Sequence, residues 1–535
     1  MLPEDRFFQT NDNRKIWQRY CGFLDLTMSE FMEIQNRLLM EQIACVSDSV
    51  LGARIMRNNK PRDINDFRRL VPITTYEDYA PYLSEQREGV LADKPLFWCH
   101  SSGRRGAFKW VPYTERAIET ITKRALSLFL LASAHSKGEI NVRPGCRVLL
   151  ILPPRPYMSG SALHYVSKRL SLNVIPPQEE TAETDIQKRL EQGFEMALDT
   201  GVDVILAIAS VLVKMGEKMT EQAHSKSLSQ NMLRPRVLAR FSNAYLRSKA
   251  SGRPMLPKDL WRAKAVIPGG IDAHIYKDKI THFWGQTPYD NYACTEVSFI
   301  AMQAWNKKWM TPVPDCAFLE FIPEEERRKS TDNPGYQPKT VLLNEVKPGK
   351  TYEVVITHFY GMPLLRYRLH DLVTFQSLSD EEAGIKLPQL TFKARAADMI
   401  PLSGLAQIDE KTLWQAIENS GLANSGWTAY KEYDNSHTYL RLCIELKDDK
   451  PHIEVADMID SQLKTIDLDY RDIDKWLNHQ PVRVTLLPNG TFERYVEEKF
   501  NEGAGLAQLK PPHMNASDAV VSRLLQLGKD TLVKS

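Results

Sequence analysis

The sequence predicts an α/β protein in which a largely parallel sheet alternates with helices. The 535-residue chain exceeds the usual size of one hydrophobic core, so we expect two or more domains. Short apolar runs such as 147–152, which Pro153 and Pro154 follow, are typical of strands buried on both faces. Helical patterns separate the early runs, and this alternation favours parallel pairing.

Two long helices are predicted in the first 135 residues. Residues 27–46 form the first, because Thr27 and Glu30 fit a capping box and apolar side chains follow at a 3.6-residue period. Thr114 is the expected N-cap of the second, since Glu115 lies in its first turn and apolar residues recur after it.

Strands and connecting segments follow in order. The further strand candidates are 202–207, 265–267, 317–322, 340–343 and 352–357. We expect the basic segment 228–258 to be a helical insertion or a mobile lid. The charged segment 324–339 contains Pro and Gly and is expected to be a loop.

Composition excludes several classes of protein. The net charge is only +2 and the two signs are interleaved, so nothing indicates binding to nucleic acid. The seven cysteines are scattered without a CxxC pair, which argues against a zinc site or a disulfide framework and favours a reducing compartment. Residues 1–6 are too acidic to begin a signal peptide, and the most apolar segment, 125–134, is shorter than the roughly 20 residues of a membrane span. We therefore expect a cytoplasmic protein with no membrane partner.

The segment 100–109 combines small residues, two glycines and a final lysine. Backbone N–H groups and hydroxyls of such a loop can turn toward phosphate oxygens, and Lys109 can add a positive charge. A plain turn before a helix is the alternative interpretation. The candidate phosphate-binding residues in this loop are Ser101, Ser102, Gly103, Arg104, Arg105 and Gly106.

Two further segments complete a nucleotide site in the expected order. Residues 291–296 read Asn-Tyr-Ala-Cys-Thr-Glu, and residues 365–371 read Leu-Arg-Tyr-Arg-Leu-His-Asp. With the loop, they resemble the motifs of the adenylate-forming superfamily of acyl-CoA synthetases, peptide-synthetase adenylation domains and luciferases. In detail they are more similar to one branch, the Gretchen Hagen auxin-responsive family of acyl acid amido synthetases and its bacterial relatives.

A third match lies near the C-terminus and is the most specific. Gly-Thr-Phe at 490–492, Gly-Ala-Gly at 503–505 and Gln-Leu-Lys-Pro at 508–511 resemble the closing motifs of that family. The resemblance therefore spans roughly residues 60 to 515.

The resemblance also implies a division into domains. A large N-terminal adenylate-forming domain would cover residues 1–395, and a smaller, mobile α+β domain would cover residues 396–535. The segment 392–400 resembles the superfamily hinge, at which the small domain rotates.

ATP and Mg²⁺ are the cofactors that the resemblance implies. Glu296 would hold Mg²⁺, which bridges phosphate oxygens and offsets their charge. Thr295 would contact the α-phosphate, Tyr292 would stack on adenine, and Cys294 would lie beside them in the nucleotide site. A buried glutamate with a structural partner is the alternative for Glu296.

The remaining roles fall later in the chain. Asp371 would accept both ribose hydroxyls, Arg395 would contact ribose or phosphate, and Lys510 would polarise the α-phosphate during adenylation. Arg366 and Arg368 are two apart and would share one strand face, with one of them pairing with Asp371 or reaching the phosphates. The alternatives are a surface salt bridge for these arginines, an ordinary interdomain ion pair for Arg395, and docking of the C-terminal tail for the Lys510 segment.

The chain departs from the family pattern at three places. Arg104 and Arg105 replace a pair of Ser/Thr residues, and His370 stands where the family has Gly. Residues 404–406 read Gly-Leu-Ala instead of Gly-Glu-Lys, so a lysine near the phosphate is missing.

The leading hypothesis is an ATP-dependent ligase that activates a carboxylic acid as an acyl-adenylate and transfers the acyl group to an amine, such as an amino acid. Its partners would be the acid and the amine. An acid–thiol ligase that uses CoA or a carrier protein, or a catalytically altered pseudoenzyme, is the alternative. Scattered apolar side chains form acyl pockets, and candidates here are 157–165 and 268–270.

Overall fold

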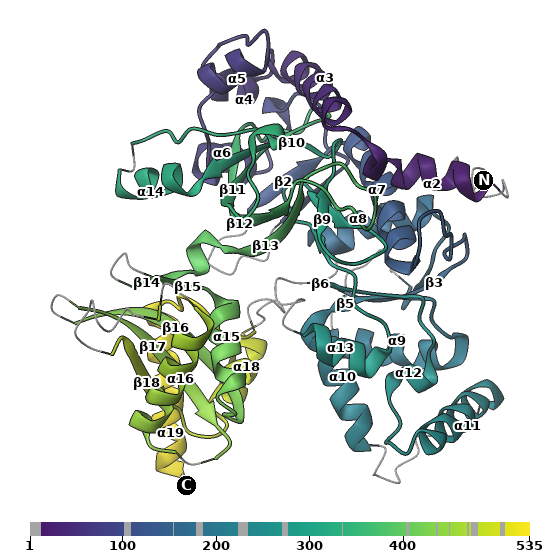
Figure 1. Cartoon of the computed structure of the whole chain (residues 1–535), viewed down its shortest axis with the longest axis vertical. Coiled ribbons are helices and arrows are strands. Elements are labelled where there is room, and N and C mark those ends of the chain that lie inside the picture. Colours follow the sequence, from purple (N-terminus) through teal and green to yellow (C-terminus); the bar gives the residue numbers. More distant parts are fainter. Residues whose placement is uncertain are drawn as a thin grey trace. The chain divides into compact units, whose positions relative to one another are not determined.

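The structure is a computed structural model of the chain. It describes residues 12–100, 109–152, 155–177, 186–222, 234–269, 276–333, 335–402, 406–434, 437–448, 450–467, 470–471, 480–502 and 509–534. The chain forms two compact units, a large N-terminal one and a smaller C-terminal one (Figure 1). The N-terminal unit holds the described residues up to Leu369 and Val373–Phe392, and the C-terminal unit holds His370–Leu372 and the described residues from Lys393 onward. The expected domain boundary at residue 395 stays a prediction.

A four-stranded parallel sheet confirms the alternation of strands and helices. Its strand order is β4 (Asn173–Ile175), β3 (Arg147–Ile151), β5 (Val204–Ile208) and β6 (Ala265–Gly269). Along β3, Val148 and Leu150 enter one apolar core while Leu149 and Ile151 enter another, so both faces of the sheet are buried as the apolar run predicts.

Helices supply those two cores. Residues of α7 (Glu115–Ser133) and α8 (Met158–Arg169) lie in the first, and residues of α9 (Ile186–Thr200), α10 (Ala209–Gln222), α11 (Pro235–Ala250) and α13 (Lys277–Trp284) lie in the second. The segment 228–258 is thus helical over α11, and α12 (Pro257–Leu260) follows it. No helix in the described ranges is long and apolar enough to span a bilayer.

The second large sheet is antiparallel in its assigned pairings, which corrects the expectation of mainly parallel sheets. Its seven strands, in spatial order, are β10 (Ala317–Pro323), β11 (Thr351–His358), β12 (Tyr367–Ser377), β13 (Gln389–Arg395), β9 (Met310–Pro312), β8 (Ala301–Gln303) and β7 (Asn291–Tyr292). The pairs β10–β11, β13–β9, β9–β8 and β8–β7 are antiparallel. Between β7 and β8, and between β8 and β9, the connections are too short for the crossover helix that a parallel pair requires.

Two local expectations in this region are wrong. Residues 340–343 do not form a strand: only Val341 bridges to Phe321, before a 3₁₀ turn at Leu343–Glu345. The segment 324–339 begins with helix α14 (Glu324–Asp332) rather than a loop. Its three glutamates lie in the first turn, where the helix dipole favours them, and Arg328 pairs with Glu324 one turn away.

The N-terminal helices agree with their sequence signals. They are α2 (Asn13–Cys21), α3 (Met28–Val46), α4 (Val50–Ile55), α5 (Ile64–Leu70) and α6 (Tyr76–Leu83). The Glu30 carboxylate accepts the Thr27 backbone N–H at 2.7 Å, and the Thr27 hydroxyl accepts the Glu30 N–H at 3.3 Å, so the predicted capping box is confirmed. Thr114 caps α7 as expected.

The C-terminal unit is built on a three-stranded sheet in which β16 (Asn424–Asp434) and β17 (His437–Leu446) are antiparallel and β18 (Val482–Leu486) is parallel to β17. The other elements are β14 (Ile400–Leu402), β15 (Ala406–Ile408), α15 (Glu410–Asn419), α16 (His452–Ile466), α18 (Thr491–Asn501) and α19 (Asp518–Lys534). Leu440, Leu442 and Ile444 of β17 pack against α15 and α16, while Cys443 joins a small core with α18 and α19. This mixed unit agrees with the expected α+β organisation.

Candidate active site

The predicted phosphate loop connects two paired strands. Strand β1 (Phe97–His100) pairs antiparallel with β2 (Trp110–Tyr113), and His100 lies opposite Trp110. The six loop residues Ser101, Ser102, Gly103, Arg104, Arg105 and Gly106 lie outside the described residues, so their role stays a prediction. The strand pairing nevertheless places His100 opposite Trp110, and Lys109 directly precedes β2.

Two tyrosines hold the Lys109 side chain. Its ammonium donates to the Tyr367 hydroxyl at 3.4 Å and lies 5.6 Å from the centre of the Tyr76 ring. The Tyr76 hydroxyl accepts the Trp110 backbone N–H at 2.7 Å, which ties α6 to β2. Lys109 is therefore held by aromatic side chains from two other elements of the same unit.

The segment 291–296 enters a tight hairpin loop between β7 and β8. Inside that loop the Ser298 N–H donates to the Cys294 carbonyl at 2.9 Å, and Ser298 takes a positive φ of 75°. Tyr292 is buried and its ring lies 5.5 Å from that of Phe392. Cys294 is partly buried, and its nucleotide contact and the stacking of Tyr292 on adenine stay predictions.

Two buried side chains fix the backbone of Thr295 and Glu296. The Tyr113 hydroxyl donates to the Thr295 carbonyl at 2.8 Å. Burial lowers the pKa of His358 to about 3, so its imidazole is neutral. Its Nδ1 accepts the Leu364 N–H at 3.2 Å, which leaves Nε2–H to donate to the Glu296 carbonyl at 2.5 Å.

The negative charge of Glu296 acts on Tyr76 and Tyr367, the two tyrosines that contact Lys109, and also on Tyr113. Burial raises the pKa of Tyr367 and Tyr113 well above the usual value, and the negative charge of Glu296 adds to both shifts. Burial raises the pKa of Tyr76 in the same way, and Glu296 again contributes. We call Tyr76, Tyr113 and Tyr367 the tyrosine cluster; it brings a cation and an anion, 187 positions apart in the sequence, into one region.

The tyrosine cluster was not predicted from the sequence. Tyr367 lies in the quoted motif 365–371, but the motif gave it no role. Tyr76, Tyr113 and His358 lie in no recognised motif, since their roles depend on elements that meet only in the folded chain.

Glu296 is the predicted Mg²⁺ ligand, and this role stays a prediction. In the described part of the chain, no group of three or more His, Cys, Asp or Glu side chains could hold a metal. Mg²⁺ commonly binds one or two carboxylates together with substrate phosphates and waters, and a single carboxylate at Glu296 fits that pattern.

Asp371 belongs to the C-terminal unit together with Arg395. The Arg395 guanidinium lies 3.4 Å from the Asp371 carboxylate, and Asp371 is only 5% exposed. The neighbouring His370 has a φ of 60°, in the left-handed region where glycine is the default residue. This conformation explains a family glycine at that position, and here histidine adopts it.

Arg366 and Arg368 do not pair with Asp371, which corrects one expectation. Arg366 precedes β12 with a φ of 44° and makes two hydrogen bonds, of 2.9 and 3.0 Å, to the buried Glu320. Arg368 binds Glu353 in the same bidentate way at 2.6 and 2.8 Å. Since Arg366 lies outside the strand, the two arginines share no strand face; both serve in buried or half-buried ion pairs of the N-terminal unit, and neither ion pair lies on an open surface.

The C-terminal candidate, Lys510, is an exposed residue of the C-terminal unit. Residues Ala396–Asp398 of the predicted hinge form a 3₁₀ turn. Residues 404 and 405, where the family pattern has a lysine nearby, lie outside the described residues. The roles of Lys510, Lys109 and Arg395 in the reaction stay predictions, as do the pocket candidates 157–165 and 268–270.

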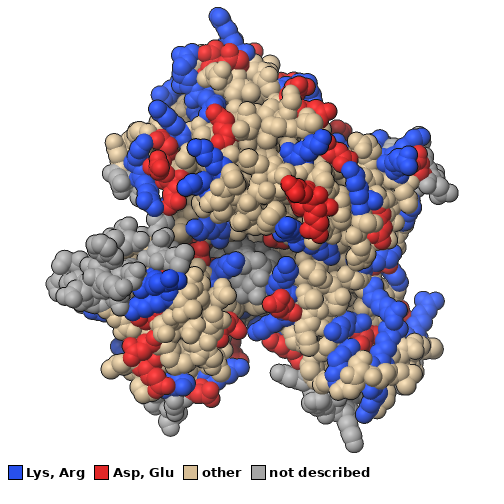
Figure 2. Space-filling model, in the orientation of Figure 1, with Lys and Arg blue, Asp and Glu red and all other residues tan. Residues whose placement is uncertain are grey.

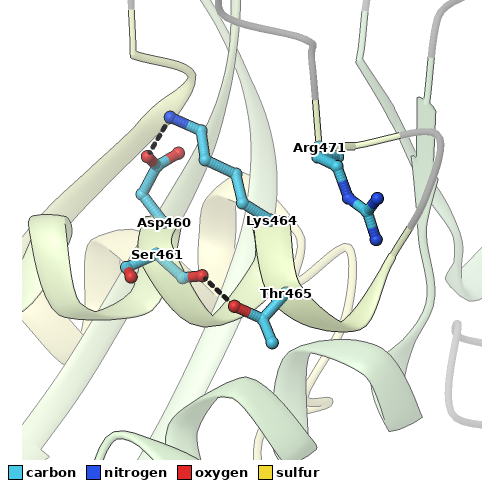
Figure 3. A pocket seen from close by; sticks show the side chains of 5 residues that line it. All are labelled: Asp460, Ser461, Lys464, Thr465 and Arg471. Carbon is cyan, nitrogen blue, oxygen red and sulfur yellow. Dashed lines mark hydrogen bonds and ion pairs between the residues drawn. The ribbon is translucent and has the colours of Figure 1, made fainter.

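A pocket of about 560 Å³ lies in the C-terminal unit, and none of the candidate site residues lines it (Figure 3). It is lined by Asp460, Ser461, Lys464, Thr465 and Arg471. Lys464 pairs with Asp460 at 2.8 Å, and Tyr470 donates to the same carboxylate at 2.7 Å. Lys464 and Asp460, which both line this pocket, therefore bind each other. On the face drawn in Figure 2, positive and negative residues lie side by side over much of the surface.

Comparison with known protein families identifies the chain. The GH3 family N-terminal domain matches residues 21–248, the GH3 family central domain matches residues 310–395, and the GH3 family C-terminal domain matches residues 411–519. The chain belongs to the GH3 family. The resemblance inferred from the motifs is thereby confirmed.

Individual GH3 relatives are distant. Jasmonoyl-L-amino acid synthetase GH3.5 of Oryza sativa subsp. japonica is 26% identical over 275 residues, which cover 47% of this chain and 45% of that relative. Indole-3-acetic acid-amido synthetase GH3.10 of Arabidopsis thaliana is 23% identical over 541 residues, 88% of each chain. These names agree with the amido synthetase expected from the sequence.

Solved structures show the same fold. The AtGH3.15 acyl acid amido synthetase in complex with 2,4-DB superposes with a TM-score of 0.69 at 19% identity and covers 95% of both chains. A 2-hydroxyisobutyryl-CoA ligase in the postadenylation state has a TM-score of 0.62 at 14% identity, over 94% of both chains. The GH3 chain therefore shares its fold with amide-forming and thioester-forming ligases.

Proposed function

We propose that this GH3 protein is an ATP-dependent acyl acid amido synthetase that couples a carboxylic acid to an amino acid. The acid attacks the α-phosphate of ATP, which gives an acyl-adenylate and releases pyrophosphate. The amine then attacks the acyl carbon, an amide bond forms, and AMP leaves. Family membership supports this reaction, and the convergence of Lys109 and Glu296 on the tyrosine cluster is the observation that carries it.

The first step brings two anions together, so the site has to neutralise charge and fix geometry. Lys109 supplies a positive charge, and its contacts with Tyr367 and Tyr76 fix the position of the ammonium group. Because the raised pKa keeps Tyr367 protonated, its hydroxyl remains a hydrogen-bond donor while it accepts from Lys109. Mg²⁺ held through Glu296 would neutralise phosphate charge when the nucleotide binds.

Ribose would bind at Asp371. A carboxylate offers about four acceptor positions, so Asp371 can hold Arg395 and accept ribose hydroxyls at the same time. Arg395 would fix the orientation of the carboxylate, and Lys510 would polarise the α-phosphate. The acid is proposed to be of the kind named for the relatives, such as indole-3-acetate, jasmonate or a 4-substituted benzoate.

A pyrophosphate-release screen tests the proposal. The full chain is incubated with ATP, Mg²⁺ and each acid, with an amino acid panel or with CoA, and pyrophosphate, AMP and product are measured. We expect acid-dependent pyrophosphate release, amide formation only with the amino acids, and loss of release in Lys109→Met. A matched control is Lys123→Met, since Lys123 pairs with Asp315 elsewhere in the unit.

Two outcomes would refute this function in different ways. AMP formation that requires CoA and ignores amino acids would identify a thiol ligase. ATP binding without pyrophosphate release from any acid would identify a pseudoenzyme.

A further inference from the structure

The chain segment that follows Lys510 is fixed to the body of the C-terminal unit. The Ala429 N–H donates to the His513 carbonyl at 2.6 Å, and the Thr428 hydroxyl donates to the Pro512 carbonyl at 2.6 Å. Met514 forms a parallel bridge with Ala429, so residues 512–514 extend the edge of β16.

A side-chain clamp secures this segment at His513. Its Nδ1–H donates to the Glu410 carboxylate at 2.6 Å, and Glu410 is the first residue of α15. The imidazole stacks on Trp427 of β16 at 4.4 Å with an interplanar angle of 15°, and the Trp414 ring of α15 approaches its edge at 5.1 Å. An acid and two indoles thus hold one imidazole, which we call the His513 clamp.

The His513 clamp is close to Lys510 in the sequence, and the chain between them is stiff. Two prolines, Pro511 and Pro512, separate Lys510 from His513. Proline fixes its own φ and restricts the residue before it, so the direction of the chain at Lys510 depends on where His513 is held. Because Lys510 and His513 are three positions apart, their Cα atoms are at most roughly 11 Å apart.

The same segment also reaches the hinge. The Asn515 side-chain amide donates to the Met399 carbonyl at 3.0 Å, directly after the 3₁₀ turn Ala396–Asp398. Residues 510–515 therefore link Lys510 to the predicted hinge, through the hydrogen bond between Asn515 and Met399.

We propose that Glu410 and His513 are positioning residues that set the direction of Lys510 for adenylation. This inference rests on the proposed function, because it assigns the clamp to the lysine of that reaction. In this role the clamp acts through the chain and not on the nucleotide, by fixing Pro512 and Met514 on β16. The competing explanation is that His513 only anchors the C-terminal tail.

A double-mutant cycle in the full chain separates the two explanations. Acid-dependent pyrophosphate release and amide formation are measured for Lys510→Ala, His513→Ala and the double variant. A misplacement of about 1 Å can cost up to about 100-fold in rate, so we expect His513→Ala to lower the adenylation rate about tenfold with the KM for ATP within twofold. In the Lys510→Ala background the same change should have no further effect.

Conservative variants provide the controls. His513→Asn keeps a side-chain donor for Glu410 and should retain at least a third of the rate, whereas Glu410→Ala should resemble His513→Ala. Thermal unfolding of every variant shows whether the chain is folded, and Glu410→Ala replaces His513→Ala in the double-mutant cycle if that variant does not fold.

The possible results lead to distinct conclusions. Additive losses in the double variant, or a wild-type rate in His513→Ala and Glu410→Ala, would overturn the positioning role and leave the proposed function intact. A wild-type adenylation rate in Lys510→Ala would overturn the role of Lys510 and the clamp with it. Absence of adenylation by the unmodified protein would overturn the proposed function itself.

Discussion

Arg366 is predicted to stabilise the fold and to take no part in nucleotide binding. Arg366 is 5% exposed, and its partner Glu320 is fully buried. The guanidinium also donates to the backbone carbonyls of Arg68 at 2.6 Å and Val71 at 2.7 Å. The variant Arg366→Met keeps most of the volume and removes all of these hydrogen bonds.

The expected loss follows from what remains around Glu320. Its carboxylate would keep the Thr340 hydroxyl at 2.6 Å and the Arg68 guanidinium at 3.7 Å. Removal of one partner from a buried ion pair costs about 3–5 kcal/mol, because the other charge stays buried. Since Arg68 remains nearby, we expect a loss of about 3 kcal/mol in the free energy of unfolding, at the lower end of that range.

Urea-induced unfolding followed by tryptophan fluorescence measures this loss, and calorimetry measures AMP affinity. Glu320→Leu combined with Arg366→Met should cost about 0.5–3 kcal/mol less than the two single changes added together. Arg441→Met, which removes the more exposed pair with Glu432 in the C-terminal unit, is the control and should cost about 1 kcal/mol or less. The reasoning is wrong if Arg366→Met weakens AMP binding at unchanged stability.

Three further predictions concern the candidate site, and a fourth concerns the stability of the fold. Asp371→Asn should weaken AMP binding about tenfold to a hundredfold in calorimetry, because ribose hydroxyls lose a charged acceptor; unchanged affinity would place the ribose elsewhere. Glu296→Gln should remove the Mg²⁺ dependence of ATP binding, and a retained dependence would exclude this carboxylate as the ligand. Replacing both Arg104 and Arg105 with Thr should lower ATP affinity, less so at high salt, whereas a gain of turnover would reveal a disabled site. Burial raises the pKa of Asp290 to about 6 from 3.8, so its ionisation destabilises the fold fully above pH 6 and progressively less as the pH falls toward 3.8. Asp290→Asn should therefore raise the free energy of unfolding by about 1–3 kcal/mol at pH 8 and by little at pH 4; an equal gain at both values would refute this.

The sequence alone predicted the features that depend on neighbouring residues. The capping box of Thr27 and Glu30 and the Thr114 cap were readable because caps involve residues within one turn. The strand at 147–152 was readable because a run buried on both faces is continuously apolar. Motif order also predicted the family, which three matched domains confirm.

Only the tertiary structure decided which distant residues meet. Arg366 bonds to Glu320, 46 positions away, and Tyr113 bonds to the Thr295 carbonyl, 182 positions away. No local pattern encodes such partners, so the sequence predicted that Arg366 or Arg368 pairs with Asp371 or reaches the phosphates, whereas both bind buried glutamates. The direction of strand pairing in the second sheet was likewise decided by the tertiary structure, because a strand has the same sequence pattern whether its neighbour is parallel or antiparallel. The tyrosine cluster shows the same principle at the site: sequence named Lys109 and Glu296 separately, and long-range packing brought them together.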